Sequence, residues 1–144
     1  MESFVGNEIS RVLVITLHRG EKLLESICEQ LQKEGIKNGI VLSGIGTLQK
    51  TVFHRVTTTN LIPNDEFITV EKPIELSSLQ GFVADGVPHF HMAFSDVEQA
   101  YTGHLENEST VLYVAEIIIA EISGLDLKRE KDENNIAFLV RKGV

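Results

Sequence analysis

The chain has 144 residues, 42% of them hydrophobic, which is enough to bury one core without disulfide bonds. Thirteen Lys and Arg residues against 21 Asp and Glu residues give a net charge of −8. This balance argues against a nucleic-acid surface, because such binding depends on clustered basic side chains. With one cysteine, no secretory signal and no apolar run of spanning length, the sequence predicts a single cytoplasmic domain over residues 1–144 and no membrane partner.

The first third of the chain changes its hydrophobic period twice. Residues 12–17 are dense in β-branched side chains and predict a buried strand. From 20 to 34, apolar residues recur at three- and four-residue spacing, which predicts an amphipathic helix that ends at Gly35. Two strand-like segments, 39–48 and 51–57, follow the helix.

The remaining two thirds of the chain are almost entirely strand-like. One helix among about nine strands predicts an α+β domain with a largely antiparallel sheet. The run 110–122 is too apolar and β-branched for an exposed helix and predicts a long central strand. Basic residues at 128, 129 and 131 alternate with acidic ones, which favours a solvated loop. The other predicted strands are 67–70, 74–84, 89–94, 100–105 and 136–140, the last of which is expected to close the sheet.

Three histidines are predicted to meet across one hairpin. His89 and His91 are two residues apart on a predicted strand and therefore share a face. The simplest symmetric register places His91 opposite His104, and His89 opposite Glu106, with paired β-carbons about 4.5–5.5 Å apart. Imidazoles at that separation can share one ion with Zn–N bonds of about 2.0–2.1 Å. The pattern makes His89, His91 and His104 a candidate metal site, with ordinary exposed histidines as the alternative. Glu106 is interpreted as an outer partner, a fourth ligand or an exposed carboxylate.

Other motifs are weaker. A bulge at Gly103 would shift the hairpin register, while His18 and His54 stand alone and are interpreted as packing or surface residues. The Gly44–Gly46 segment lacks the third glycine of a dinucleotide loop, because Gln49 stands in its place. No helix follows the segment, so no dinucleotide cofactor site is expected.

Several segments together resemble the plants-and-prokaryotes conserved (PPC) family. The resemblance covers roughly residues 12–121 and implies an α+β fold, a homotrimer and a zinc-like centre at His89, His91 and His104. The sequence is also similar to the acetolactate decarboxylase fold, which implies Arg55 or Glu75 as polar partners of the metal. The segments that carry the resemblance are Leu17-His18-Arg19-Gly20-Glu21, Val41 to Leu48, Glu75 to Gly81, His89-Phe90-His91, Gly103-His104-Leu105 and Ala115-Glu116.

The resemblance leaves three functions open. The first is a metal-binding trimer whose small-molecule ligand or reaction is undefined. The second is a DNA-associated regulator, as the family is often labelled, although this chain is acidic and lacks the Arg-Gly-Arg-Pro core of an AT-hook. The third is a zinc-dependent lyase or hydrolase, in which the ion polarises a carbonyl or activates water.

Overall fold

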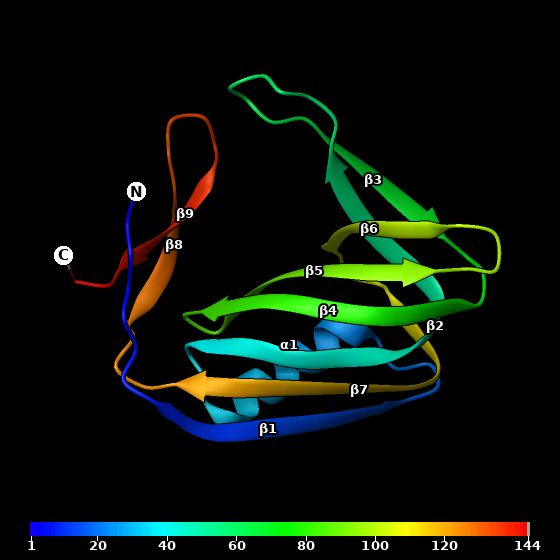
Figure 1. The fold of residues 1–144 in the computed structure, drawn as a ribbon, viewed down its shortest axis with the longest axis horizontal. Coiled ribbons are helices and arrows are strands. Elements are labelled where there is room, and N and C mark those ends of the chain that lie inside the picture. Colours follow the sequence, from blue (N-terminus) through cyan, green and yellow to red (C-terminus); the bar gives the residue numbers. More distant parts are fainter. Residues whose placement is uncertain (144) are drawn as a thin grey trace.

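A computed structural model describes residues 1–143 and contains two sheets and one helix (Figure 1). The larger sheet has seven strands in the order β1-β7-β2-β4-β5-β6, with β3 paired to β2, and its strand pairings within residues 1–143 are antiparallel. The predicted α+β fold is therefore confirmed. The elements are β1 (Ile9–His18), α1 (Leu23–Glu34), β2 (Gly39–Val56), β3 (Asp65–Val70), β4 (Ile74–Ala84), β5 (Val87–Ser95), β6 (Ala100–Leu105), β7 (Thr110–Ile122), β8 (Leu127–Lys131) and β9 (Ala137–Arg141).

The helix covers one face of the sheet and closes the core. Leu23, Ile27 and Leu31 recur at helical spacing and are fully buried, because this stripe faces the strands. Gly35 ends the helix with φ 68°, a left-handed conformation that glycine adopts without steric cost. Among residues 1–143, no helix has the length and apolarity that a membrane span requires.

Strand β2 is continuous over 18 residues where the sequence predicted two strands. Its first part pairs with β7 and β4, and its last part pairs with β3 and β6. The pairings β2–β4, β4–β5, β5–β6 and β6–β2 therefore form a closed ring of four strands. Inside this ring lie buried apolar side chains that include Phe53, Leu79, Phe90, Met92 and Phe94.

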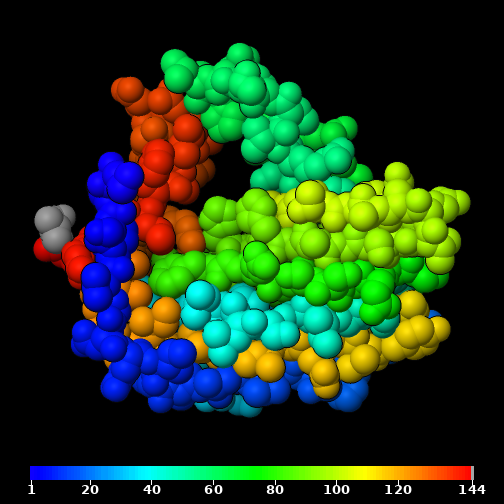
Figure 2. Space-filling model, viewed as in Figure 1, coloured from blue at the N-terminus to red at the C-terminus, as the bar shows by residue number. Residues whose placement is uncertain are grey.

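Strands β8 and β9 form a separate hairpin beside the N-terminal segment (Figure 1). Two expectations were wrong here: residues 127–131 form a strand and not a solvated loop, and β9 pairs with β8 without closing the main sheet. The hairpin and the arm formed by the β2–β3 connection rise on either side of an opening above β4 and β5 (Figure 2).

Candidate functional site

Four histidines gather on the outer face of the strand ring, which is the face opposite the buried core. His89 and His91 come from β5, His104 from β6 and His54 from β2. His104 is the backbone partner of His91 on one side and of His54 on the other. Antiparallel register therefore places the His104 side chain between the other histidines.

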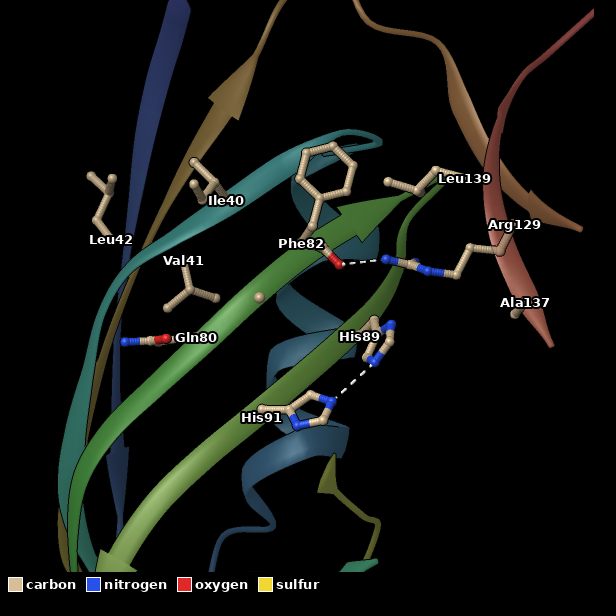
Figure 3. A pocket seen from close by; sticks show the side chains of 11 residues that line it. Ile40, Val41, Leu42, Gln80, Phe82, His89, His91, Arg129, Ala137 and Leu139 are labelled. Carbon is tan, nitrogen blue, oxygen red and sulfur yellow. Dashed lines mark hydrogen bonds between the residues drawn. The ribbon is translucent and has the colours of Figure 1, made fainter. Parts of the chain in front are cut away.

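The rings of His89, His91 and His104 are nearly equidistant. Their centroids lie 5.2 Å apart for His89–His91, 5.0 Å for His89–His104 and 5.4 Å for His91–His104. The Nε2 atoms of His89 and His91 are 3.2 Å apart (Figure 3). The His54 ring stacks on His104 at 4.5 Å. Each of the four imidazole rings therefore lies next to at least one other imidazole ring.

One carboxylate oxygen joins His54 and His104. Oε1 of Glu106 lies 2.6 Å from Nδ1 of His54 and 3.1 Å from Nδ1 of His104. If both Nδ1 atoms donate to this oxygen, both Nε2 atoms keep a free lone pair, which is the form that binds a metal. The ligand atoms of His54, His104 and Glu106 lie within 4.8 Å of one another, and within residues 1–143 they are the one group of three potential ligands with that spacing.

The electrostatics favour neutral imidazoles. Burial lowers the pKa of His89 to about 4, and the nearby charges of His104, Arg129, His91 and His54 act in the same direction. Burial also lowers the pKa of His91 and of His104. Neutral rings at physiological pH can bind a cation without first releasing a proton.

The predicted hairpin register is confirmed between His91 and His104, and the β5–β6 pairing continues from there without a bulge. Gly103 instead allows β6 to pack closely against β2, because a Cβ at this position would lie 2.6 Å from the Phe53 ring. The interpretation of His54 as a solitary residue was wrong. The predicted pairing of His89 with Glu106 does not form, because the β5–β6 ladder begins at His91 and His104 and β6 ends at Leu105.

The two weaker candidates lie apart from the histidines. Arg55 follows His54 on β2, so its side chain leaves the opposite face of the strand, where it pairs with Glu66 at 3.4 Å. Glu75 pairs with Ser95 near the start of β4, five positions from the residue that pairs with His91. Neither position supports the role that the resemblance implied.

A pocket of about 690 Å³ opens beside His89 and His91 (Figure 3). Its floor is the outer face of β2, β4 and β5, and its wall is the β8–β9 hairpin. Arg129 projects from this wall above His89 (Figure 3). Arg129 was not predicted as a site residue. Its spacing of two residues from apolar Leu127 could have indicated a strand with both side chains on one face.

Comparison with known proteins agrees with the fold. Residues 5–123 match the Plants and Prokaryotes Conserved (PCC) domain family. A plant- and prokaryote-conserved protein of Pyrococcus horikoshii has 27% identity and TM-score 0.81 over 100% of both chains. A metal-containing protein of Archaeoglobus fulgidus has 25% identity and TM-score 0.80, covering 96% of this chain and 97% of its own. The sequence has no match among curated proteins.

More distant structures share the fold. A Bacteroides thetaiotaomicron protein named as a candidate DNA-binding protein has 15% identity and TM-score 0.78, over 94% of this chain and 96% of its own. The predicted likeness to the acetolactate decarboxylase fold is also confirmed. A Staphylococcus aureus protein similar to that enzyme has 18% identity and TM-score 0.54, over 79% of this chain and 53% of its own.

Proposed function

The chain belongs to the Plants and Prokaryotes Conserved domain family, and we propose that it is a homotrimeric protein that binds one zinc ion per chain through His89, His91 and His104. The observation that carries the proposal is the spacing of the three rings, at 5.0, 5.2 and 5.4 Å. In a tetrahedral site with Zn–N bonds of about 2.0–2.1 Å, ligand nitrogens lie about 3.3 Å apart and ring centres about 5.2 Å apart. The Nε2 separation of 3.2 Å between His89 and His91 fits this geometry.

Glu106 supports this ligand set over the alternative of His54, His104 and Glu106. Its carboxylate accepts from Nδ1 of His104 and so leaves Nε2 of that ring for the ion. Carboxylates in this outer position orient a metal-bound imidazole and increase its basicity. The metal-containing nature of the Archaeoglobus fulgidus relative adds to the case.

Three histidines leave one tetrahedral position open, where a bound ion would polarise a carbonyl or activate a water molecule. A zinc-dependent lyase or hydrolase is therefore the second function that the site supports. The likeness to the Staphylococcus aureus structure shows the fold alone and does not assign this chemistry.

The trimer is proposed from the family resemblance and from an apolar surface. The outer face of β1 and β2 exposes Val12, Val14, Leu42 and Ile45, each to about half its surface. Exposed apolar faces of this kind mark contacts between chains. Light scattering should give about three times the chain mass of 16.0 kDa, and a monomer at micromolar concentration would contradict the proposal.

A DNA-associated role is the other alternative, and charge weighs against it. Six basic side chains already pair with carboxylates, which removes them from any phosphate-binding stripe: Arg11, Lys22, Arg55, Lys72, Lys128 and Lys142. At near-physiological salt, we expect no sub-micromolar affinity for mixed or AT-rich duplexes by fluorescence anisotropy. The single free cysteine accords with the cytoplasmic location that we propose.

Metal analysis of protein purified without a histidine tag tests the zinc proposal. We expect about one zinc per chain in the wild type and none in the double variant His91→Ala/His104→Ala, because a single remaining imidazole cannot hold the ion. His18→Ala is the matched control and should keep its metal, since His18 lies on β1 opposite Val114. Stoichiometric metal in the folded double variant would overturn the ligand set. Metal loss in His54→Ala, with retention in His89→Ala, would favour the alternative group.

A further inference from the structure

The pocket beside the histidines has a chemically mixed lining. Apolar side chains from the sheet and the hairpin, among them Ile40, Phe82 and Leu139, form much of its surface. His89, His91 and Arg129 contribute the polar part (Figure 3). A volume of about 690 Å³ is within the usual range for sites that bind small molecules.

The guanidinium of Arg129 has N–H donors left over for a ligand. Its Nη1 donates to the carbonyl of Val87 at 3.1 Å, and its Nη2 donates to the carbonyl of Phe82 at 3.2 Å. These two bonds fix the guanidinium and use two of its five N–H donors, so three remain. Among residues 1–143, no Asp or Glu lies within ion-pair distance of Arg129, in contrast to the six paired basic residues named above.

This cation therefore lies fixed, unneutralised and partly buried on the wall of an apolar pocket. Partial burial lowers the pKa of Arg129, but a guanidinium starts so high that it stays charged at neutral pH. Removal from water strengthens its attraction for an anion. A planar fork of N–H donors matches the two oxygens of a carboxylate.

We propose that the pocket binds a small organic carboxylate with a short aliphatic chain, whose carboxylate pairs with Arg129 while the chain packs against Phe82 and Leu139. The inference rests on the proposed metal centre, because an ion held by His89 and His91 would border the same pocket. A 2-oxo carboxylate could then offer its carboxylate to Arg129 and its carbonyl to the ion. Arg129 lies beyond residues 5–123, so this binding group is outside the segment that matches the family.

Titration calorimetry with zinc-loaded protein tests the proposal, with 3-methyl-2-oxobutanoate as the probe. We expect measurable binding to the wild type and an affinity loss of about 10- to 100-fold in Arg129→Gln, the size expected for a charge-assisted pair. Lys128→Gln is the matched control. It removes the same charge from the adjacent position of β8, whose side chain faces the other way and pairs with Glu130, so its affinity should not change.

Two further ligands identify what the site recognises. 3-Methyl-2-butanone has the same carbon chain without the carboxylate and should bind weakly and equally to the wild type and Arg129→Gln. Inorganic phosphate should bind less tightly than the oxo acid, because it cannot use the apolar lining. Phosphate binding tighter than the oxo acid, equal oxo-acid affinity in wild type and Arg129→Gln, or no oxo-acid binding to fully loaded wild type would each overturn the proposal.

Metal content separates this inference from the proposed function. Arg129→Gln should retain its zinc, so lost carboxylate affinity at full metal content counts for the inference. If the wild type holds no zinc, carboxylate binding that still depends on Arg129 would support the anion site while the metal proposal fails. Arg129→Lys keeps the charge without the fork and should give intermediate affinity. Circular dichroism would exclude any variant that is unfolded.

Discussion

The main sheet and the β8–β9 hairpin border the same pocket but are stabilised differently. In the sheet, β5 pairs on both sides and packs Phe90 and Phe94 into the core. In the hairpin, β8 and β9 pair only with each other, within residues 1–143. A few contacts attach the hairpin to the sheet. They are the buried side chain of Leu127, the bond from its N–H to the side chain of Asn38, the bonds from the Arg129 side chain to two backbone carbonyls, and the ion pair of Lys142, next to β9, with Asp85.

This difference in stability separates the proposed ion-binding residues from the proposed anion-binding residue. The histidines lie on strands that should open only with global unfolding, whereas Arg129 lies on an element that local fluctuations can release. A metal centre needs rigid ligands, and a ligand pocket needs an entry path. Ion binding and anion binding should therefore respond to different perturbations.

The largest effect is expected from breaking the sheet at Gly103. A Cβ at this position would lie 2.6 Å from the Phe53 ring and 2.8 Å from the carbonyl oxygen of His54, and that backbone cannot move aside cheaply. Gly103→Val should therefore lower the free energy of unfolding by about 3 kcal/mol. Urea denaturation would measure this loss, and Thr102→Val on the exposed neighbouring position is the control. Wild-type stability of Gly103→Val would contradict the close packing of β6 on β2.

A smaller effect is expected from substituting Glu106, which contacts His54 and His104 but does not line the pocket. Glu106→Gln keeps the shape of the side chain but removes the charge that faces Nδ1 of His54 and His104. Metal affinity should fall by about 10- to 100-fold, the usual result of removing an outer partner of a metal-bound histidine. Chelator competition would measure it, with Glu75→Gln as the control. Unchanged affinity would show that the carboxylate does not orient His104.

The hairpin should respond to Asn38→Ala with a local loss of about 1 kcal/mol. The substitution leaves the N–H of Leu127 without the Oδ1 acceptor, which lies 3.2 Å away. Hydrogen exchange should become faster in β8 and β9 but not in β5, and carboxylate affinity should fall while zinc content stays constant. Asn134→Ala in the exposed hairpin turn is the control. Equal acceleration in β5 would contradict the independence of the two regions.

The smallest effect is expected from pH in the metal-free protein. Because the pKa of His89 is lowered to about 4, the unfolded chain binds more protons than the native chain between about pH 6.5 and 4. The free energy of unfolding should therefore decrease as pH falls through this window. In His89→Gln/His91→Gln the decrease should be shallower, as urea denaturation at several pH values would show. Parallel curves for the two proteins would refute the contribution of the histidines.

The sequence predicted those features of the fold that are set by segments lying close together in the chain. The β5–β6 register was predictable because a short loop links the strands, and Asp96 fixes that loop by accepting from the N–H groups of Glu98 and Gln99. The helix followed from hydrophobic periodicity and its end from Gly35, although it begins at Leu23 and not at residue 20. The meeting of three of the four clustered histidines, His89, His91 and His104, was therefore predictable from sequence.

Contacts between distant segments were not predictable. His54 joins His104 across 50 positions, through a pairing of β2 with β6 that no local pattern specifies. The sequence predicted two strands, 39–48 and 51–57, but the structure joins them through register shifts into one strand. Strand β8 was not predicted because its sequence alternates in charge and has one buried apolar side chain, Leu127. The strand is stabilised by pairing with β9.

The continuity of β2 has a consequence for how such chains can change in length during evolution. Ile40 near its start lines the pocket, and His54 near its end contacts His104. A one-residue insertion between these positions that no further bulge absorbed would turn every later side chain to the opposite face, sending His54 into the core and Phe53 into solvent. The connections at 57–64 and 132–136 carry no such constraint, because each is a loop between two paired strands and a longer loop leaves the strand register unchanged. Length variation among functional relatives should therefore concentrate in these two connections and be absent within β2.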